Sequence, residues 1–230
     1  MRWNLACSGF RMIVWVTAAL GALLPRSAAA QRIDWLIVPG QRVGPITAAT
    51  TRADLDTLFG KDNVRDGSLD SSEIPEAATV VFGNDPSAAL AITWDRERPS
   101  TIHICFGTQT GPCKWRTASG VRIGLPLMEL QKINGKSFQL TGYGSDESGT
   151  VTSWRHGTLE EDPSACGHLM VRLTPAAEVE GRPLSKQESS LLKQFQGDKP
   201  YSSGTLSLQD LDLLVSALEL QFTAPGCMSK

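Results

Sequence analysis

The chain has 230 residues, of which 41% are hydrophobic and 20% are charged, and its formal net charge is −2. A chain of this length and composition can bury a sizeable hydrophobic core, in one domain or in two small ones. The near-neutral charge and the lack of a basic run exclude the electrostatic footprint with which proteins bind nucleic acid or anionic membranes.

Residues 1–30 are predicted to be a cleavable export signal. Two arginines precede an apolar stretch, residues 12–24, which is too short to span a bilayer and has the length of a signal h-region. The small side chains of residues 28–30 suit a signal peptidase, so the mature chain is expected to begin at Gln31. Its net charge would be about −5, because three basic residues and no acidic residue lie in the signal. We therefore expect a periplasmic or secreted protein without a transmembrane segment in the mature chain.

Four cysteines follow the signal, and an even number in an oxidising compartment indicates two disulfides. Cys105 and Cys113 flank a segment with two glycines and a proline, which is typical of a turn between two strands. The pairing of Cys105 with Cys113 and of Cys166 with Cys227 is therefore favoured over the two other possible pairings. Because no Cys-x-x-Cys motif is found, we expect structural disulfides rather than redox-active or metal-bound thiols.

Two segments, residues 46–61 and 121–136, resemble each other at an offset of 75 residues. Each passes from a short apolar approach through a helix-start signal to a one-sided apolar stripe. The similarity predicts two short helices in equivalent places. It also leaves open an internal repeat that pairs residues 43–118 with residues 119–222.

The boundaries of both helices are indicated by local signals. The first is predicted to start at Thr51, which has the spacing of a capping box with Asp54. The second is predicted to start near Pro126, a residue favoured in the first turn. Both are expected to end at a glycine with a left-handed backbone, Gly60 in the first helix and Gly135 in the second.

Short runs of β-branched or alternating apolar residues predict strands between and after these helices. The pair 101–106 and 113–117 is expected to form a hairpin pinned by the first disulfide. Leu184–Phe195 is predicted to be a third helix, and residues 197–204 an exposed loop. Short helices among antiparallel strands define an α+β fold, here as a single domain over residues 31–230. The other expected strands are 78–82, 90–94, 137–142, 150–154, 169–173 and 215–222.

The opening VPGQRVGPIT of residues 38–47, continued by Leu55 and Phe59-Gly60, resembles the start of an uncharacterised family of exported bacterial proteins. Residues 120–130, 134–138 and 142–154 resemble the same family, so the resemblance would span nearly the whole mature chain. It implies export and no known activity. The predicted repeat is also similar in architecture to tandem β-lactamase inhibitor proteins and to small outer-membrane assembly lipoproteins, a likeness that concerns the fold alone.

Two known motifs are matched only in part. Residues 62–73 place side-chain oxygens, a glycine and a leucine as in a calcium-binding loop, but Val64 stands where the third position needs an oxygen. The favoured interpretation is a polar loop in which Val64 opens a strand. Ser190 and Lys193 match the Ser-x-x-Lys of penicillin-recognising enzymes, whose companion motifs are missing, so a helix-surface serine is favoured.

The glycine-rich stretch 142–149 joins two predicted strands and is the most promising binding loop. Aromatic and carboxylate side chains on a loop are typical of binding surfaces. The candidate binding residues are Tyr143, Asp146, Trp154 and His156. The alternative is a hairpin loop whose glycines serve turns, with both aromatic rings packed in the core.

Neither a nucleophile–base set nor a metal-binding spacing is found, so no catalytic residue, metal or cofactor is predicted. The leading hypothesis is a non-enzymatic binding or interaction module of the cell envelope, whose partner is an unknown protein or a small envelope ligand. Two alternatives remain. One is an envelope-acting hydrolase that uses Asp146, Glu147 and His156, and the other is an inhibitor-like protein that binds an enzyme through a duplicated sheet.

Overall fold

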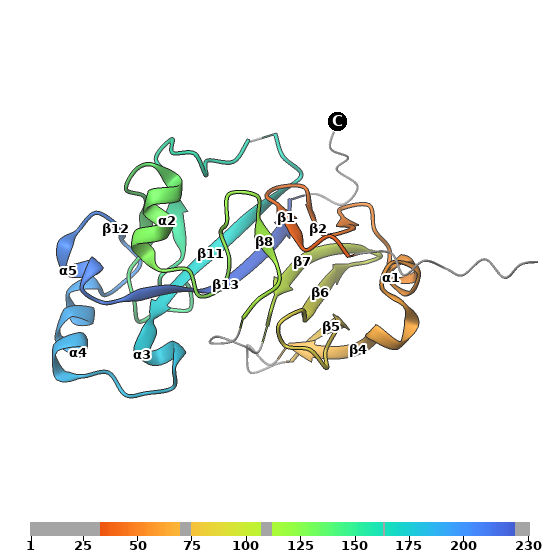
Figure 1. Cartoon of the computed structure of the whole chain (residues 1–230), viewed down its shortest axis with the longest axis horizontal. Coiled ribbons are helices and arrows are strands. Elements are labelled where there is room, and N and C mark those ends of the chain that lie inside the picture. The colour runs from red at the N-terminus through yellow and green to blue at the C-terminus, as the bar shows by residue number, and fades with distance from the viewer. Residues whose placement is uncertain (1–32, 70–74, 107–111, 163, 224–230) are drawn as a thin grey trace, which may run out of the picture. The chain divides into compact units, whose positions relative to one another are not determined.

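The computed structural model of the protein describes residues 33–69, 75–106, 112–162 and 164–223 (Figure 1). Thirteen strands and five short α-helices lie within these residues, which confirms the predicted α+β fold. The described residues belong to one compact unit. The predicted export signal and the predicted partner of Cys166, Cys227, lie outside the described residues, so both stay predictions.

The largest sheet has six antiparallel strands in the order β11-β13-β7-β6-β5-β4. Four of them follow one another along the chain as a meander: β4 (Val64–Leu69), β5 (Glu76–Val81), β6 (Leu90–Asp95) and β7 (Arg98–Ile104). The long strand β13 lies between β7 and β11, so it joins the two halves of the chain in one sheet. These last two strands are β11 (Gly167–Pro175) and β13 (Leu213–Phe222).

Two smaller sheets complete the fold. The second sheet contains, in this order, β3 (Ile46–Thr47), β2 (Arg42–Val43), β1 (Leu36–Val38) and β8 (Arg116–Thr117). Strand β8 is parallel to β1, and the other pairs of this sheet are antiparallel. The third sheet contains β10 (Val151–Ser153), β9 (Gln139–Thr141) and β12 (Pro200–Ser202). Because β12 pairs with β9, the prediction of a loop throughout residues 197–204 is wrong.

Cys105 and Cys113 form a disulfide, as predicted, with their Cα atoms 6.0 Å apart. The bridge does not pin a hairpin, because β7 pairs with β6 and β13, whereas β8 pairs with β1. The predicted hairpin of residues 101–106 and 113–117 is therefore wrong. Between the two cysteines the chain passes from the large sheet to the second sheet, and the disulfide ties these sheets together.

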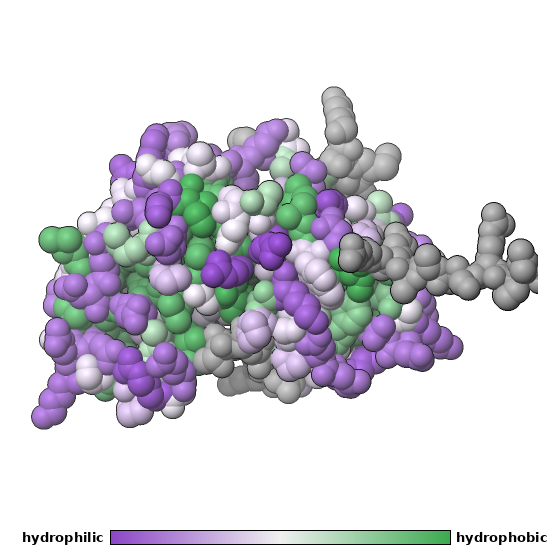
Figure 2. Space-filling model, viewed as in Figure 1, coloured by the Kyte–Doolittle hydropathy of each residue, from purple (hydrophilic) through white to green (hydrophobic). Residues whose placement is uncertain are grey.

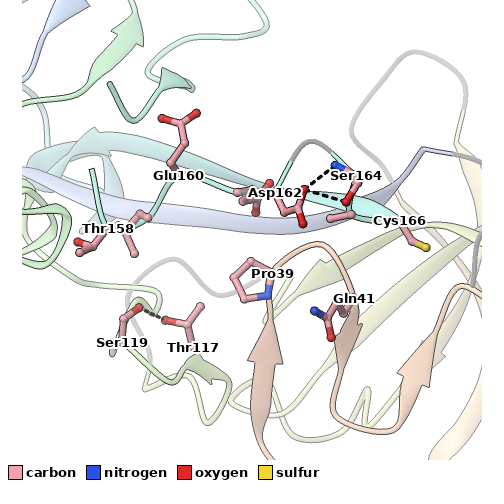
Figure 3. Close-up of a pocket in the computed structure, with 12 residues that line it drawn as sticks. Pro39, Gln41, Thr117, Ser119, Thr158, Glu160, Asp162, Ser164 and Cys166 are labelled. Carbon is pink, nitrogen blue, oxygen red and sulfur yellow. Dashed lines mark hydrogen bonds between the residues drawn. The ribbon is translucent and has the colours of Figure 1, made fainter. Parts of the chain in front are cut away.

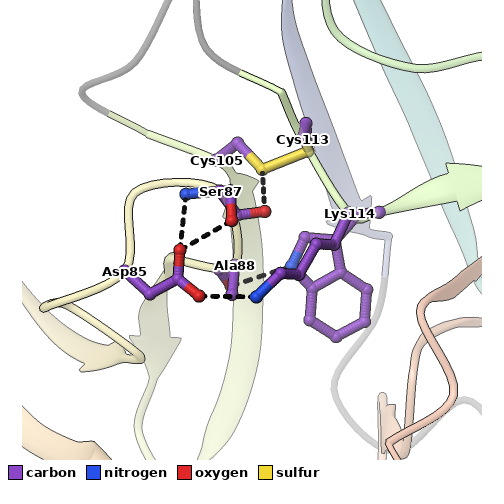
Figure 4. A network of polar contacts seen from close by, with 7 residues as sticks. Asp85, Ser87, Ala88, Cys105, Cys113 and Lys114 are labelled. Atoms are coloured by element: carbon purple, nitrogen blue, oxygen red, sulfur yellow. Dashed lines mark hydrogen bonds and ion pairs between the residues drawn. A yellow bond between two sulfur atoms is a disulfide. The ribbon is translucent and has the colours of Figure 1, made fainter.

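Polar and aromatic contacts beside the disulfide hold the same two sheets together (Figure 4). Lys114 Nζ lies 2.6 Å from Asp85 Oδ2, in the connection between β5 and β6, and its hydrogen bond lowers the pKa of Asp85. The fully buried Trp115 donates from Nε1 to the Ala88 carbonyl over 2.8 Å. Its ring packs edge-on against Trp35, with the ring centroids 4.8 Å apart. These contacts fix β1 and β8 against the meander.

The helices are short, and local signals set their ends. Helix α1 (Arg52–Phe59) has the predicted capping box, in which Thr51 and Asp54 exchange side-chain to backbone hydrogen bonds. Helix α2 (Leu127–Asn134) follows Pro126 and ends at Gly135 in the predicted left-handed conformation. Gly60 has φ 84° and ψ 135°, so the left-handed cap predicted there is wrong. The remaining helices are α3 (Ala176–Val179), α4 (Lys186–Leu192) and α5 (Leu206–Gln209), with 3₁₀ turns at Lys61–Asn63 and Lys193–Phe195.

The strands that follow α1 and α2 are distributed differently. After α1 the chain forms the meander of the large sheet, whereas after α2 it forms the β9–β10 pair of the third sheet and then β11. The two halves thus differ in where their strands lie, and the internal repeat stays a prediction.

The surface mixes hydrophilic and hydrophobic residues. Figure 2 shows mostly hydrophilic residues on one face, with hydrophobic residues exposed toward the end where α5 lies. Leu206, at the start of α5, is 77% exposed. None of the helices in the described part of the chain has the length and hydropathy of a membrane span.

Candidate functional site

The predicted binding loop, residues 142–149, is packed between the third sheet and β11. Tyr143 is buried, its hydroxyl donates to the Leu173 carbonyl over 3.3 Å, and its backbone N–H donates to the Phe195 carbonyl over 2.7 Å. Burial raises the pKa of Tyr143 well above its usual value. Gly149 approaches the Leu173 carbonyl so closely that a Cβ atom would collide with it. These contacts support the alternative of a turn packed into the core.

The other predicted binding residues do not come together. Trp154 is buried and packs on Phe138, with the ring centroids 5.2 Å apart. Asp146 and Glu147 are exposed before β10, and His156 is exposed after it. The two carboxylates and the imidazole therefore lie at opposite ends of a strand. The hydrolase alternative needs these three side chains in one cavity, and the described structure does not assemble them.

The other two histidines each pair with one carboxylate. His103 Nδ1 on β7 lies 3.3 Å from Glu219 Oε1 on β13, and His168 Nδ1 lies 2.5 Å from Glu161 Oε2. The hydrogen bond to Glu161 raises the pKa of His168 above its usual value. In the described part of the chain, no three His, Cys, Asp or Glu side chains are grouped so that they could hold a metal ion.

The partial calcium motif coincides with a strand. Val64–Leu69, the third to eighth positions of the motif, form β4 and pair with β5 along their whole length. An extended strand cannot wrap its side chains around one ion as a calcium loop does. Asp70 and Glu73, the ninth and twelfth positions, lie outside the described residues. Ser190, from the Ser-x-x-Lys match, is exposed on α4, as favoured.

A cavity of about 710 Å³, here named the α1–β4 groove, is lined by the start of α1 and by the outer strands of the large sheet. Figure 1 labels these elements, α1 beside β4 and β5. Four segments that are distant in sequence line it: the start of α1, β4, β5, and the end of β6 with the following turn. The groove is partly open to solvent. It is the part of the described structure that best combines a hollow, apolar walls and convergent polar groups.

The groove is hollow because its walls carry small side chains. Ala53 lines it from α1 and Ala77 from β5, on the same face of the sheet as Thr79. Gly67 and Ala78 line it with their backbone, because their side-chain positions lie on the opposite face, where a Cβ atom on Gly67 would meet Val80. Elsewhere between helix and sheet, large residues such as Leu55 fill the space and are fully buried. Protein interiors are normally packed without such gaps, so two alanines and exposed strand backbone at one place leave room for a ligand.

Trp94 forms the aromatic wall of the groove. It lies two residues after the buried Ile92, on the same face of β6. Its Nε1 donates to Thr79 Oγ1 over 3.0 Å, and Thr79 is itself buried on β5. This hydrogen bond fixes the orientation of the half-buried indole and satisfies its only donor.

Charged side chains of both signs lie at the rim. Arg52 lies 3.3 Å from Asp66 and 3.4 Å from Asp56, and the side chain of Asp66 is 91% exposed. Arg96 and Glu97 stand opposite, in the turn after β6, and are exposed. The rim therefore offers hydrogen-bond donors and acceptors without an excess of either charge.

Two contacts hold the start of α1 in place beside the groove. The Arg98 side chain, at the start of β7, donates to the carbonyl of Ala49, in the segment before α1. At the start of α1, hydrogen bonds from Thr51 lower the pKa of Asp54, so this carboxylate stays ionised and stabilises the helix N-terminus. The first contact joins the segment before α1 to the start of β7, and the second stabilises the helix start itself.

A second cavity, of about 450 Å³, lies between the turn after β1 and the segment that precedes β11 (Figure 3). Three acidic residues line it, but each already accepts hydrogen bonds within the protein. Glu160 accepts from the backbone of His156, Glu161 from the backbone of Leu169, and Asp162 from Ser164. We infer that these three carboxylates stabilise the backbone around them and are not free to bind a ligand.

No family model matches the chain, and neither a curated protein nor a solved structure was found to be similar to it. The resemblance of the opening residues to an uncharacterised exported family therefore stays a prediction. Function has to be argued from the geometry of the groove.

The groove was not predicted from the sequence, although two of its residues, Asp66 and Gly67, belong to the partial calcium motif. One signal was available, because Trp94 ends a predicted strand and is followed within four residues by Asp95, Arg96, Glu97 and Arg98. The small residues Gly67, Ala77 and Ala78 carry no such signal. Their role depends on the pairing of β4 with β5 and on the position of α1.

Proposed function

We propose that the protein is an exported, non-enzymatic binding protein of the cell envelope that holds a small ligand in the α1–β4 groove. The observation that carries the proposal is the groove itself: about 710 Å³ of space beside small apolar side chains and Trp94, with charged side chains of both signs at the rim. Concave, mostly apolar sites with a few convergent polar groups are the usual form of small-ligand sites. The disulfide between Cys105 and Cys113 is compatible with an oxidising compartment outside the cytoplasm.

Binding rather than catalysis is proposed because of the chemistry of the lining. The groove contains arginine, aspartate and glutamate side chains but no histidine, cysteine or serine. Its only buried hydroxyl, that of Thr79, accepts the hydrogen bond from Trp94. The Thr51 hydroxyl, which also lines the groove, donates to the Asp54 carboxylate over 2.8 Å, but this contact belongs to the capping box of α1.

The proposal is tested by a thermal-unfolding screen of the purified protein against muropeptides, oligosaccharides, phospholipid headgroups and short peptides. A ligand that binds only the folded protein, at a hundred times its Kd, should stabilise it by about 2.7 kcal/mol. The groove-filling variant Ala77→Phe should abolish the effect, because Ala77 lines the groove and an aromatic residue suits a strand.

The matched control is Glu76→Phe, which adds the same ring to the neighbouring residue of β5, outside the groove lining. It should leave binding unchanged. A ligand that still binds to the Ala77→Phe variant would place the binding site elsewhere and contradict the proposal. The absence of any stabilising ligand in all four classes would contradict it as well.

A further inference from the structure

We infer that the α1–β4 groove takes a neutral oligosaccharide, with one sugar ring lying against the indole of Trp94. The inference rests on the proposed function, since it names the ligand class for the same groove. It follows from the balance of charge at the rim, from the hydrogen bond that already occupies the indole N–H group, and from the shape of the site.

The balance of charge at the rim argues against an anionic ligand. Two guanidinium groups, Arg52 and Arg96, and two carboxylates, Asp66 and Glu97, line the groove. Arg52 is already partly neutralised by its contacts with two aspartates. An anion would meet repulsion from both carboxylates, whereas a sugar hydroxyl both donates and accepts hydrogen bonds and can use either kind of group.

The indole of Trp94 offers its ring rather than its N–H group. Nε1 is occupied by Thr79, so a ligand gains contact with the π face and no hydrogen bond to the nitrogen. The C–H groups on one side of a pyranose ring carry partial positive charge and pack well against the negative face of an aromatic ring. The alanines beside Trp94 provide no polar partner, which suits the apolar side of the same sugar ring.

The shape of the site favours a chain of sugar rings over a lipid tail. A lipid chain gains affinity when an enclosed apolar cavity buries most of its surface. The α1–β4 groove is not an enclosed cavity, and four charged residues line it. An oligosaccharide can lie in such a groove with one ring on Trp94 and its outward hydroxyl groups in water.

Isothermal titration calorimetry with chitotriose and maltotriose, two neutral trisaccharides of different sugar type, tests the inference on the full protein. We expect at least one of them to bind. Trp94→Ala should weaken its binding at least tenfold, whereas Trp94→Phe, which keeps an aromatic face, should weaken it only a few-fold. Arg96→Ala should also weaken it, and Arg122→Ala, which changes an exposed arginine outside the groove, should have no effect.

If Trp94→Ala fails to fold, Trp94→Phe still tests whether the indole contributes to trisaccharide binding. Equal trisaccharide affinity of the wild type and Trp94→Phe, together with full binding to Ala77→Phe, would overturn the inference. So would a panel in which a headgroup, a muropeptide or a peptide binds in an Ala77-dependent way and neutral sugars do not. In that last case the proposed function stands and only the ligand class is wrong, whereas no binding of any class contradicts both.

Discussion

Trp94 Nε1 lies 3.0 Å from Thr79 Oγ1, and this hydrogen bond joins neighbouring strands at the floor of the groove. Thr79 is 3% exposed, so water cannot readily replace the acceptor if it is lost. Thr79→Val keeps the shape of the side chain and removes its oxygen. We expect the free energy of unfolding to fall by about 1–2 kcal/mol, because the half-buried indole N–H is left without its partner. Urea unfolding measures this change.

The control for this variant is Thr152→Val on β10, where the threonine side chain is exposed. A surface substitution of this kind is expected to change stability by less than about 0.5 kcal/mol. Equal urea midpoints for both variants would show that the hydrogen bond to Trp94 does not contribute to stability.

Local features of the fold could be predicted from the sequence, because their causes lie within a few residues. The capping box of Thr51 and Asp54 depends on a three-residue spacing, and so does the start of α1. The proximity of Cys105 and Cys113 was enough to predict their disulfide, but not which strands they follow. That depends on the pairing of β8 with β1, across about 80 residues of sequence, which no local pattern records.

In β13 one β-bulge makes a prediction from the alternation of apolar residues fail. The sequence predicts that Val215 and Leu218 lie on opposite faces, yet both are buried. A register shift places Arg172 opposite Ala217 and Leu173 opposite Val215, so Ser216 is an extra residue in β13. The bulge turns both apolar side chains toward the core. The α1–β4 groove was missed for a related reason, since its walls meet only through sheet pairing and helix packing.

Removal of the disulfide between Cys105 and Cys113 is expected to destabilise the protein. A bridge that closes a loop of about nine residues restricts the unfolded chain by about 2–3 kcal/mol. The double variant Cys105→Ala/Cys113→Ala should therefore unfold at lower urea concentration by that amount. Peptide mapping without reductant should find the Cys105–Cys113 link in the wild type. A variant as stable as the wild type would show that the contacts of Lys114 and Trp115 suffice to hold the two sheets together.

Gly149 is expected to be essential for the turn that packs against β11. Its φ of 71° and its approach to the Leu173 carbonyl both disfavour a Cβ atom. Gly181 has a similar φ of 69° but open space around its missing side chain. Gly181→Ala should therefore cost about 1 kcal/mol from backbone conformation alone. Gly149→Ala should cost at least about 2 kcal/mol more, because β11 or the turn has to move. Thermal unfolding of both variants separates the energetic cost of the backbone conformation from the cost of the steric collision. Equal losses of stability in the two variants would contradict the close packing of this turn.

The pair of His168 and Glu161 predicts a pH-dependent contribution to stability. The hydrogen bond to Glu161 raises the pKa of His168 in the folded protein above its usual value of 6.5. The stabilisation is therefore fully present below about pH 6.5 and is lost as the pH rises through the folded pKa. Since the His168 side chain is 49% exposed, the contribution should stay below about 1 kcal/mol.

The variant His168→Gln tests this sign. Its Tm should lie below that of the wild type by more at pH 6 than at pH 8.5, because only the protonated imidazole gains from the carboxylate. His156→Gln is the matched control, since His156 is exposed after β10 and its variant should show the same small Tm difference at both pH values. If the gap between His168→Gln and the wild type widens as the pH rises, the imidazole stabilises the segment before β11 in its neutral form. Glu161 would then hold that segment through its hydrogen bond from the backbone of Leu169 rather than through the ion pair.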